Sequence, residues 1–217
     1  MPQTVQSEVA GSDAGLTDEA LLEAARGGDR GAFDTLVHRY EKELYGYLRR
    51  YLNDAALAED VFQNTFLKVF EKLDQYEAGR PVRPWLYTIA THQAVDALRR
   101  VNRRSAVSLD RKGSTGAEAD QSSLADLLVS RDQSPQDALS LEEQRQALRQ
   151  AVEGLPELYR EVLLLAYYQE MKYKDIAEVL GVPVGTVKSR LHAAVGRLLE
   201  KMRGHTDGAE TAPIPQD

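Results

Sequence analysis

The stretch that decides the fold runs from Tyr173 to His192 and reads YKDIAEVLGVPVGTVKSRLH. Its apolar residues recur at helical spacing on both sides of Gly181, which can adopt the left-handed conformation that ends a helix. Residues 182–184 (Val-Pro-Val) then predict a bend. Ala177 lies four residues before Gly181 and Val187 six residues after it. This is the spacing of a helix-turn-helix, in which a small residue lets two helices approach and a valine fills the gap. The spacing alone leaves an ordinary helical hairpin as the alternative.

The second helix of this stretch favours DNA as its partner. At 100° per residue its apolar side chains share one face, which must be the buried one: Val187, Leu191, Val195, Leu198 and Met202. The opposite face is small and polar with basic residues around it, so it can approach a major groove while Arg and Lys reach guanine edges or phosphates. A protein-binding face more often shows aromatic anchors. The candidate DNA-binding residues are Thr186, Lys188, Ser189, Arg190, His192 and Arg197.

Helical periodicity over most of the chain predicts an all-α protein, built from two small helical domains joined by a flexible linker. The first domain spans residues 16–104, with Thr17 as the N-cap of its first helix, and the second spans residues 141–203. Residues 105–140 between them are rich in Gly, Ser, Asp and Gln and predict the linker. The polar ends, residues 1–15 and 204–217, are expected to be disordered.

The composition of the 217-residue chain is that of a globular protein, with 42% hydrophobic and 28% charged residues. It contains no cysteine, which excludes disulfides, thiolate metal sites and cysteine nucleophiles. The longest apolar run, residues 162–168, is far shorter than the roughly 20 residues that span a bilayer, and the N-terminus does not resemble a signal peptide. We therefore expect a soluble, cytoplasmic protein without membrane insertion.

Enzyme signatures are largely missing from the sequence. It lacks a phosphate-binding P-loop, a dinucleotide-binding glycine motif and an H-E-x-x-H zinc motif, and its four histidines are scattered. The carboxylates have the spacing of solvated helix faces. These observations predict no catalytic residue, no metal site and no cofactor. A helical hydrolase or transferase is a rival interpretation that would need an acid–base site of another kind.

The net charge of −7 argues against nucleic-acid binding only until its distribution is considered. The two ends and the linker together carry −8, whereas the two predicted domains together carry +1. Within the domains, four arginines between residues 99 and 104 have no acid among them, and residues 185–203 hold five basic residues against Glu200. Two local basic patches on an acidic chain are therefore a more specific observation than the net charge.

Motifs in both domains resemble one known family. Leu155–Val162 (LPELYREV), Tyr173–Ala177 (YKDIA) and Gly185–Leu191 (GTVKSRL) resemble region 4 of the sigma-70-family factors. Asp60–Phe66 (DVFQNTF) resembles region 2.2, and Arg83–Ala90 (RPWLYTIA), with the charged residues that follow it, resembles regions 2.3 and 2.4. The match covers about residues 18–104 and 141–203 in the family's order. More narrowly, the chain resembles the extracytoplasmic-function (ECF) group, which keeps only regions 2 and 4.

The resemblance implies a sigma factor that gives core RNA polymerase (β′ and β subunits) its promoter specificity and helps to open promoter DNA, with an anti-sigma factor as a further candidate partner. In the family, region 2.2 docks on the β′ subunit, regions 2.3 and 2.4 capture a flipped base of the minus-10 element, and region 4 binds the minus-35 element. The implied docking residues are Asp60, Gln63, Asn64, Phe66 and Lys68. The implied minus-10 residues are Trp85, Tyr87, His92, Asp96, Arg99, Arg100, Arg103 and Arg104, and the minus-35 residues are the six named above.

Three residues depart from the family pattern. Asn64 stands in place of an acid, which implies one weaker ion pair with the polymerase. His92 stands in place of an asparagine near the base pocket and Ala193 in place of a basic residue, so the promoter sequence is not carried over. Trp85 has a place in the hydrophobic core as its alternative, and the polar residues around Gln63 have a solvated surface as theirs. The rival binding function is a stand-alone helix-turn-helix regulator whose other domain senses a ligand or dimerises. The docking and minus-10 motifs argue against it.

Overall fold

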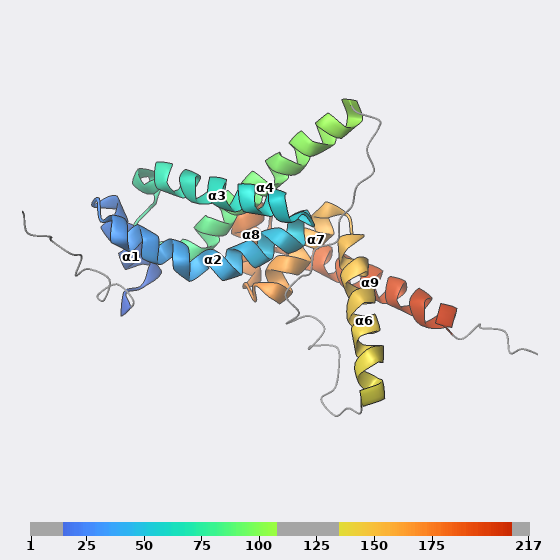
Figure 1. Ribbon diagram of the computed structural model, residues 1–217. Helices are drawn as coiled ribbons and strands as arrows, with labels where there is room; N and C mark the ends of the chain where they lie inside the picture. The colour runs from blue at the N-terminus through green and yellow to red at the C-terminus, as the bar shows by residue number, and fades with distance from the viewer. Residues whose placement is uncertain (1–14, 108–134, 210–217) are drawn as a thin grey trace, which may run out of the picture. The chain divides into compact units, whose positions relative to one another are not determined.

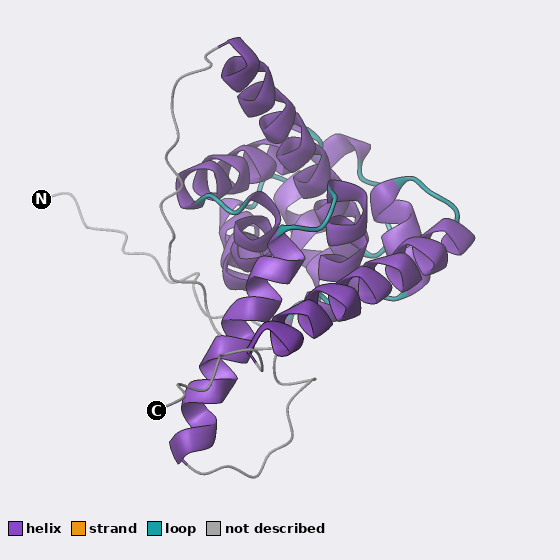
Figure 2. Ribbon diagram, turned by 90° about the vertical axis from the view of Figure 1, so that its right-hand side faces the viewer, coloured by secondary structure: helices purple, strands orange, loops and turns teal. Residues whose placement is uncertain are grey.

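The computed structural model describes residues 15–107 and 135–209, with side chains over 15–103 and 144–203. The chain divides into two compact units, residues 1–117 and 118–217, and the described residues of both are helical, without a β-strand (Figure 2). The first unit contains α1 (Asp18–Arg26), α2 (Arg30–Leu52), α3 (Ala55–Glu71), a 3-10 turn (Leu73–Gln75) and α4 (Val82–Val107) (Figure 1). The second contains α6 (Pro135–Glu153), α7 (Glu157–Leu163), a π-helical segment (Leu164–Tyr168), α8 (Tyr173–Leu180) and α9 (Val184–Ala209). The predicted all-α class is confirmed.

Short polar side chains define the helix starts of the first unit. Thr17 caps α1, as predicted, because its hydroxyl accepts a hydrogen bond from the Ala20 N–H at 3.3 Å. Asp29 and Asp54 cap α2 and α3 in the same way, and Asn53 ends α2 in the left-handed conformation with φ 53°. The adjacent caps at residues 53 and 54 turn the chain directly from α2 into α3.

The first unit is organised around α2, which packs against α1, α3 and α4. Its core combines aliphatic side chains, leucines above all, with three fully buried tyrosines, Tyr47, Tyr51 and Tyr87. The rings of Tyr47 and Tyr51 stack with centroids 5.9 Å apart, and the Tyr47 hydroxyl lies 3.0 Å from Thr91 Oγ1. The hydroxyl contact satisfies two buried polar groups and joins α2 to α4.

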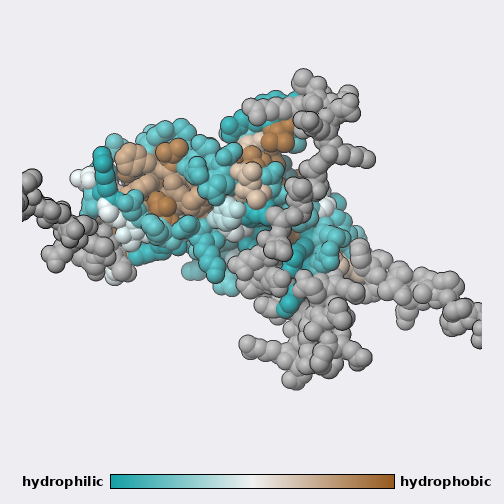
Figure 3. Space-filling model, viewed as in Figure 1, coloured by the Kyte–Doolittle hydropathy of each residue, from teal (hydrophilic) through white to brown (hydrophobic). Residues whose placement is uncertain are grey.

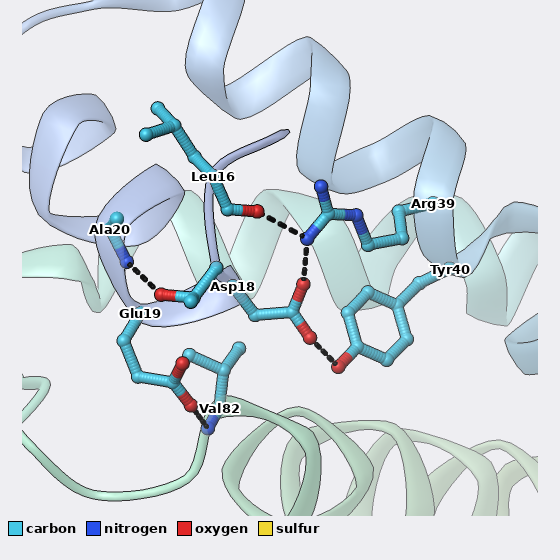
Figure 4. Close-up of polar contacts among 8 residues, drawn as sticks. Leu16, Asp18, Glu19, Ala20, Arg39, Tyr40 and Val82 are labelled. Atoms are coloured by element: carbon cyan, nitrogen blue, oxygen red, sulfur yellow. Dashed lines mark hydrogen bonds and ion pairs between the residues drawn. The ribbon is translucent and has the colours of Figure 1, made fainter. Parts of the chain in front are cut away.

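Acidic side chains of α1 tie it to α2 and α4 (Figure 4). Asp18 accepts hydrogen bonds from Arg39 Nη1 and from the Tyr40 hydroxyl of α2, both at 2.5 Å. Burial, and then the hydrogen bond to Asp18, raise the pKa of Tyr40, which stays protonated. Glu19 accepts a hydrogen bond from the Val82 N–H at 3.3 Å, so α1 also fixes the first residue of α4.

The second unit is organised around α9, which packs against α6, α7 and α8. Gly181 ends α8 in the left-handed conformation with φ 62°, and Val187 is fully buried, so the predicted helix-turn-helix is confirmed. Val195 and Met202, which were predicted to be buried, are half-buried. The buried side of α9 is instead centred on the fully buried Ala194, which places residues 195 and 202 at its edge.

Three helix ends differ from the predicted domain boundaries. α4 continues to Val107 and α6 begins at Pro135, both inside the predicted linker, and α9 continues to Ala209, inside the predicted C-terminal tail. Proline suits the first position of a helix, where its missing N–H leaves no intrahelical bond unmade. The rest of the predicted linker and of both tails lies outside the described residues. None of the described helices combines the length and the apolar composition needed to cross a membrane.

Candidate nucleic-acid interface and docking surface

The outward face of α4 carries five of the predicted minus-10 residues: Trp85, His92, Asp96, Arg99 and Arg103. Their spacing of seven, four, three and four residues puts them on one side of the helix. All are exposed except Trp85, which is half-buried. Arg100 is exposed beside this face, with its Nε donating to the Asp96 carbonyl at 3.1 Å, and Arg99 Nη1 lies 3.7 Å from Asp96 Oδ1. The side chain of Arg104 lies outside the described residues.

Trp85 begins this face and is held by the loop before α4. Its ring lies against that of Tyr76, with centroids 5.2 Å apart, and the Tyr76 hydroxyl donates to the Arg80 carbonyl. Tyr76 is buried, so it fixes the tryptophan from one side. The core and surface interpretations of Trp85 therefore each hold in part, because the half-buried indole packs on protein and still leaves part of its surface accessible.

The prediction that Tyr87 adds a second accessible aromatic surface is wrong. Tyr87 is fully buried, and its hydroxyl donates to Glu43 Oε1 at 2.7 Å. Burial, and then the Glu43 carboxylate, raise the pKa of Tyr87, so the phenol remains a hydrogen-bond donor. The reason is geometric, because two residues along a helix correspond to a rotation of about 200°, which sends Trp85 and Tyr87 to opposite sides.

Four of the predicted docking residues lie on the outward face of α3: Asp60, Gln63, Asn64 and Lys68. The first three are exposed and the lysine is half-buried. Gln63 Nε2 donates to Glu59 Oε1 at 2.9 Å, and Lys68 Nζ donates to Glu71 Oε2 at 2.6 Å. Polar contacts of this kind at a surface contribute little stability, so a partner can replace them.

Phe66, the fifth predicted docking residue, has a buried side chain and so does not lie on the outward face with the other four. Its ring lies edge-to-face against those of Phe33 and Phe62, with centroid distances of 6.3 and 5.1 Å. Phe33 belongs to α2, so Phe66 joins α3 to α2 and supports the outward face from within.

Two exposed apolar residues of α3 were missed by sequence reasoning. Leu67 is 61% exposed and Phe70 is 57% exposed, and Phe70 also contacts the ring of Phe33 at 5.4 Å. Figure 3 shows apolar residues gathered on the visible face of the first unit, over α3 and the adjoining α2. The signal was present in the sequence, because Leu67 lies at helical spacing from Asp60 and Gln63 and therefore belongs among polar side chains.

Four of the predicted minus-35 residues share the outward surface at the start of α9: Thr186, Lys188, Ser189 and His192. Three are exposed and Thr186 is half-buried. Ser189 Oγ donates to the Thr186 carbonyl at 3.1 Å, which holds the short serine side chain close to the helix. This surface admits close approach of a DNA groove, with Lys188 as its exposed cation.

Arg190 and Arg197, the other two predicted minus-35 residues, each contact α7 of their own unit. Arg190 Nη1 lies 3.1 Å from Glu161 Oε1, with the two side chains only 26% and 13% exposed. The Arg197 guanidinium lies over the Tyr159 ring, 4.7 Å from its centroid. Burial raises the pKa of Glu161 to about 7, although Arg190 opposes the change. Arg190 therefore joins α9 to α7 through a half-buried contact, whereas Arg197 contacts α7 and remains exposed.

Sequence reasoning also missed three exposed residues at the start of α8: Lys172, Tyr173 and Lys174. In a helix-turn-helix the first helix crosses the DNA backbone, so cations at its start can reach phosphates. The signal was two lysines around a tyrosine, directly before the amphipathic helix.

Two family models match this chain, Sigma-70 region 2 over residues 36–104 and Sigma-70, region 4 over residues 145–198. In this order they define a sigma-70-type transcription initiation factor, with α3 in region 2 and the helix-turn-helix in region 4. The chain is 30% identical over 182 residues to the ECF RNA polymerase sigma factor SigW of Bacillus subtilis, an alignment that covers 84% of this chain and 95% of SigW. The chain belongs to the ECF sigma factors of the sigma-70 family. This membership sets aside the alternative of a stand-alone regulator.

Two solved structures share the fold. CnrH, in complex with the cytosolic domain of CnrY, has a TM-score of 0.61 at 24% identity and covers 86% of this chain and 97% of its own. The sigma factor RpoE from Bartonella quintana, in complex with the anti-sigma factor NepR, has a TM-score of 0.56 at 23% identity and covers 85% and 92%. At these identities the likeness is one of fold.

Proposed function

We propose that this sigma factor directs core RNA polymerase to a set of promoters and helps to open the DNA there, in the cytoplasm and without bond chemistry of its own. The observation that carries the proposal is the outward face of α4, with an aromatic side chain at its start and arginines toward its end. Such a face suits a single DNA strand, because a base can stack on the aromatic ring while cations hold the phosphates.

Docking on the polymerase is assigned to the outward face of α3. Leu67 and Phe70 provide exposed apolar surface, and Asp60, Gln63 and Asn64 provide polar groups beside it. An apolar centre with a polar rim is the usual composition of a protein interface, and a helix of the β′ subunit can pack on such a face. Asn64 offers a hydrogen bond where an acid would offer an ion pair.

Recognition of the minus-10 element is assigned to α4. Trp85 is positioned to stack on an unpaired base, and His92 and Asp96 can contact base edges further along the same face. Arg99 and Arg103 then hold phosphates of the same strand. Because opening exposes the bases that this face binds, binding favours the melted promoter over the duplex.

Recognition of the minus-35 element is assigned to the helix-turn-helix. Ser189 and His192 face the groove with Lys188, and Lys172 and Lys174 hold the DNA backbone. Ala193 adds no charge to this surface, so we expect a modest electrostatic contribution from α9.

A protein inhibitor is part of the proposal. The related fold of RpoE was solved with its anti-sigma factor. An inhibitor that covers the apolar surface at Leu67 and Phe70, which we assign to the polymerase, would compete with core polymerase for binding.

The test is run-off transcription from genomic fragments with purified core RNA polymerase and the full-length chain. We expect discrete transcripts that require both components and that disappear when Ser189→Glu places a negative charge on the groove-facing surface of α9. Core polymerase alone and the chain alone are the controls. If no fragment gives a transcript beyond the core-polymerase control, the proposed function is wrong.

A further inference from the structure

One carboxylate joins α2 to the start of α4. Glu43 Oε1 accepts hydrogen bonds from Arg83 Nε at 3.0 Å, from Arg83 Nη2 at 2.5 Å and from the Tyr87 hydroxyl at 2.7 Å. The Arg83 guanidinium also lies over the Tyr87 ring, 5.5 Å from its centroid. Three donors on one oxygen make a cluster whose geometry is tightly constrained, because hydrogen bonds to a charged group are strong and directional.

The cluster is protected from water on its inner side. Tyr87 is fully buried, while the side chains of Glu43 and Arg83 are 38% and 35% exposed. One turn further along, the Tyr47 hydroxyl lies 3.0 Å from Thr91 Oγ1, and both groups are buried. The polar contacts between α2 and α4 therefore begin at the surface and continue into the core.

These contacts all lie on one side of α4, opposite the side that we assign to DNA. Residues 83, 87 and 91 are four apart and point toward α2, whereas Trp85, His92 and Asp96 point away from it. Apolar packing is non-directional and leaves a helix some freedom to rotate about its axis. Directional hydrogen bonds on the inner side remove that freedom and so set the direction of the outer face.

The geometry points to Glu43 as a positioning residue for minus-10 recognition: it fixes the rotation of α4 on α2, and thereby the direction in which Trp85 and His92 meet the DNA strand. The inference rests on the proposed function of α4. Glu43 touches no nucleotide in this role and lies outside every sequence motif of the family resemblance, so its effect is on discrimination between bases and not on attachment to the polymerase.

The experiment uses holoenzyme made from core polymerase and the full-length chain. The probe is a single-stranded DNA oligonucleotide enriched from a random pool by the wild-type holoenzyme, and its partner carries one substitution in the enriched motif. The ratio of the two dissociation constants measures discrimination, and affinity for core polymerase is measured in parallel. The variants are Glu43→Ala and Glu43→Gln, with Glu41→Ala and Glu41→Gln as matched controls, because Glu41 is an exposed residue of the same helix.

We expect Glu43→Ala to lower the discrimination ratio about tenfold, the size of effect that one hydrogen bond to a charged group can have. Glu43→Gln keeps an oxygen that accepts from Tyr87 but loses the charge that holds Arg83, so it should lie between Glu43→Ala and wild type. The two Glu41 variants should discriminate as wild type does, and none of the four should change affinity for core polymerase.

Three results would overturn the inference. Glu43→Ala holoenzyme could discriminate as well as wild type, or core affinity could fall by the same factor as discrimination, which would indicate a general loss of structure. If Glu43→Ala does not fold, undiminished discrimination by Glu43→Gln is the deciding result. Failure of the wild-type holoenzyme to enrich any motif is distinguishable from these, since it would overturn the proposed function and this inference together.

Discussion

Replacing Leu67 by alanine tests the docking face of α3 with little effect on the folded chain. Complete burial of a leucine side chain contributes about 1.5–3 kcal/mol. Leu67 is 61% exposed in the free protein, so docking can bury about three fifths of the surface of this leucine. That burial contributes about 1–2 kcal/mol to the free energy of binding. The dissociation constant for core polymerase should therefore rise roughly 5- to 30-fold. Because the side chain already faces solvent, the melting temperature should change little.

The measurement is a competition assay in which the variant displaces labelled wild-type protein from core polymerase. The matched control is Leu16→Ala, which makes the same chemical change at another exposed leucine of the first unit, 39% exposed and away from α3. Its side chain points away from the polar contacts in Figure 4, where only its carbonyl accepts a hydrogen bond from Arg39. Equal affinities of the Leu67 variant, the Leu16 variant and wild type would refute the assignment of this face.

Three further predictions concern the DNA surfaces and pH. Arg100→Ala with Arg103→Ala should reduce open-complex formation, seen by permanganate footprinting, more than core binding and less on a pre-melted template; equal failure on both templates would make these arginines general DNA-holding residues. Ser189→Glu should abolish binding to minus-35 duplex DNA in a mobility-shift assay while far-ultraviolet circular dichroism stays unchanged; normal binding would show that this side of α9 does not face the groove. Burial raises the pKa of Glu161 from 4.5 to about 7, so between these two pH values the folded state binds a proton that the unfolded state has released. The contribution of Glu161 to the free energy of unfolding is therefore fully present below pH 4.5 and is lost as pH rises toward 7. The loss is at most about 3 kcal/mol. The free energy of unfolding of Glu161→Gln, measured in urea as a function of pH, should lack this decline, since the amide still accepts a hydrogen bond from Arg190. Parallel pH profiles of this free energy for the variant and wild type would refute the prediction for Glu161.

The helices and their turns were predictable because their signals are local. Thr17 before an acidic first turn and Gly181 after an amphipathic helix each determine a helix end through their own backbone conformation, and both predictions are confirmed. The helix ends at Val107, Pro135 and Ala209 were not predictable from composition. Small polar residues have low helix propensity and are also typical of linkers, so composition does not distinguish the two.

The candidate site was predictable to the level of the helix but not of each side chain. Periodicity separates the two sides of a helix, yet the prediction grouped Trp85 with Tyr87 because both are aromatic, although their spacing puts them on opposite sides. The partner of Arg190 was not predictable for a different reason. Arg190 is paired with a residue 29 positions earlier, and nothing in the local sequence identifies that partner.

On the proposed function, the contact of Arg190 with Glu161 affects how promoter affinity is shared between the two units. With Arg190 engaged on α7 and an alanine at residue 193, the outward surface at the start of α9 is largely short and polar, which suits shape and hydrogen-bond recognition better than strong electrostatic attraction. In the proposed function this surface supplies only part of the promoter affinity. The outward face of α4 supplies the rest, because two contacts made by one chain with one promoter render the second contact intramolecular. Affinity then depends on both contacts being made together, so a promoter that matches only one of them is rejected, and the selectivity exceeds what either unit provides.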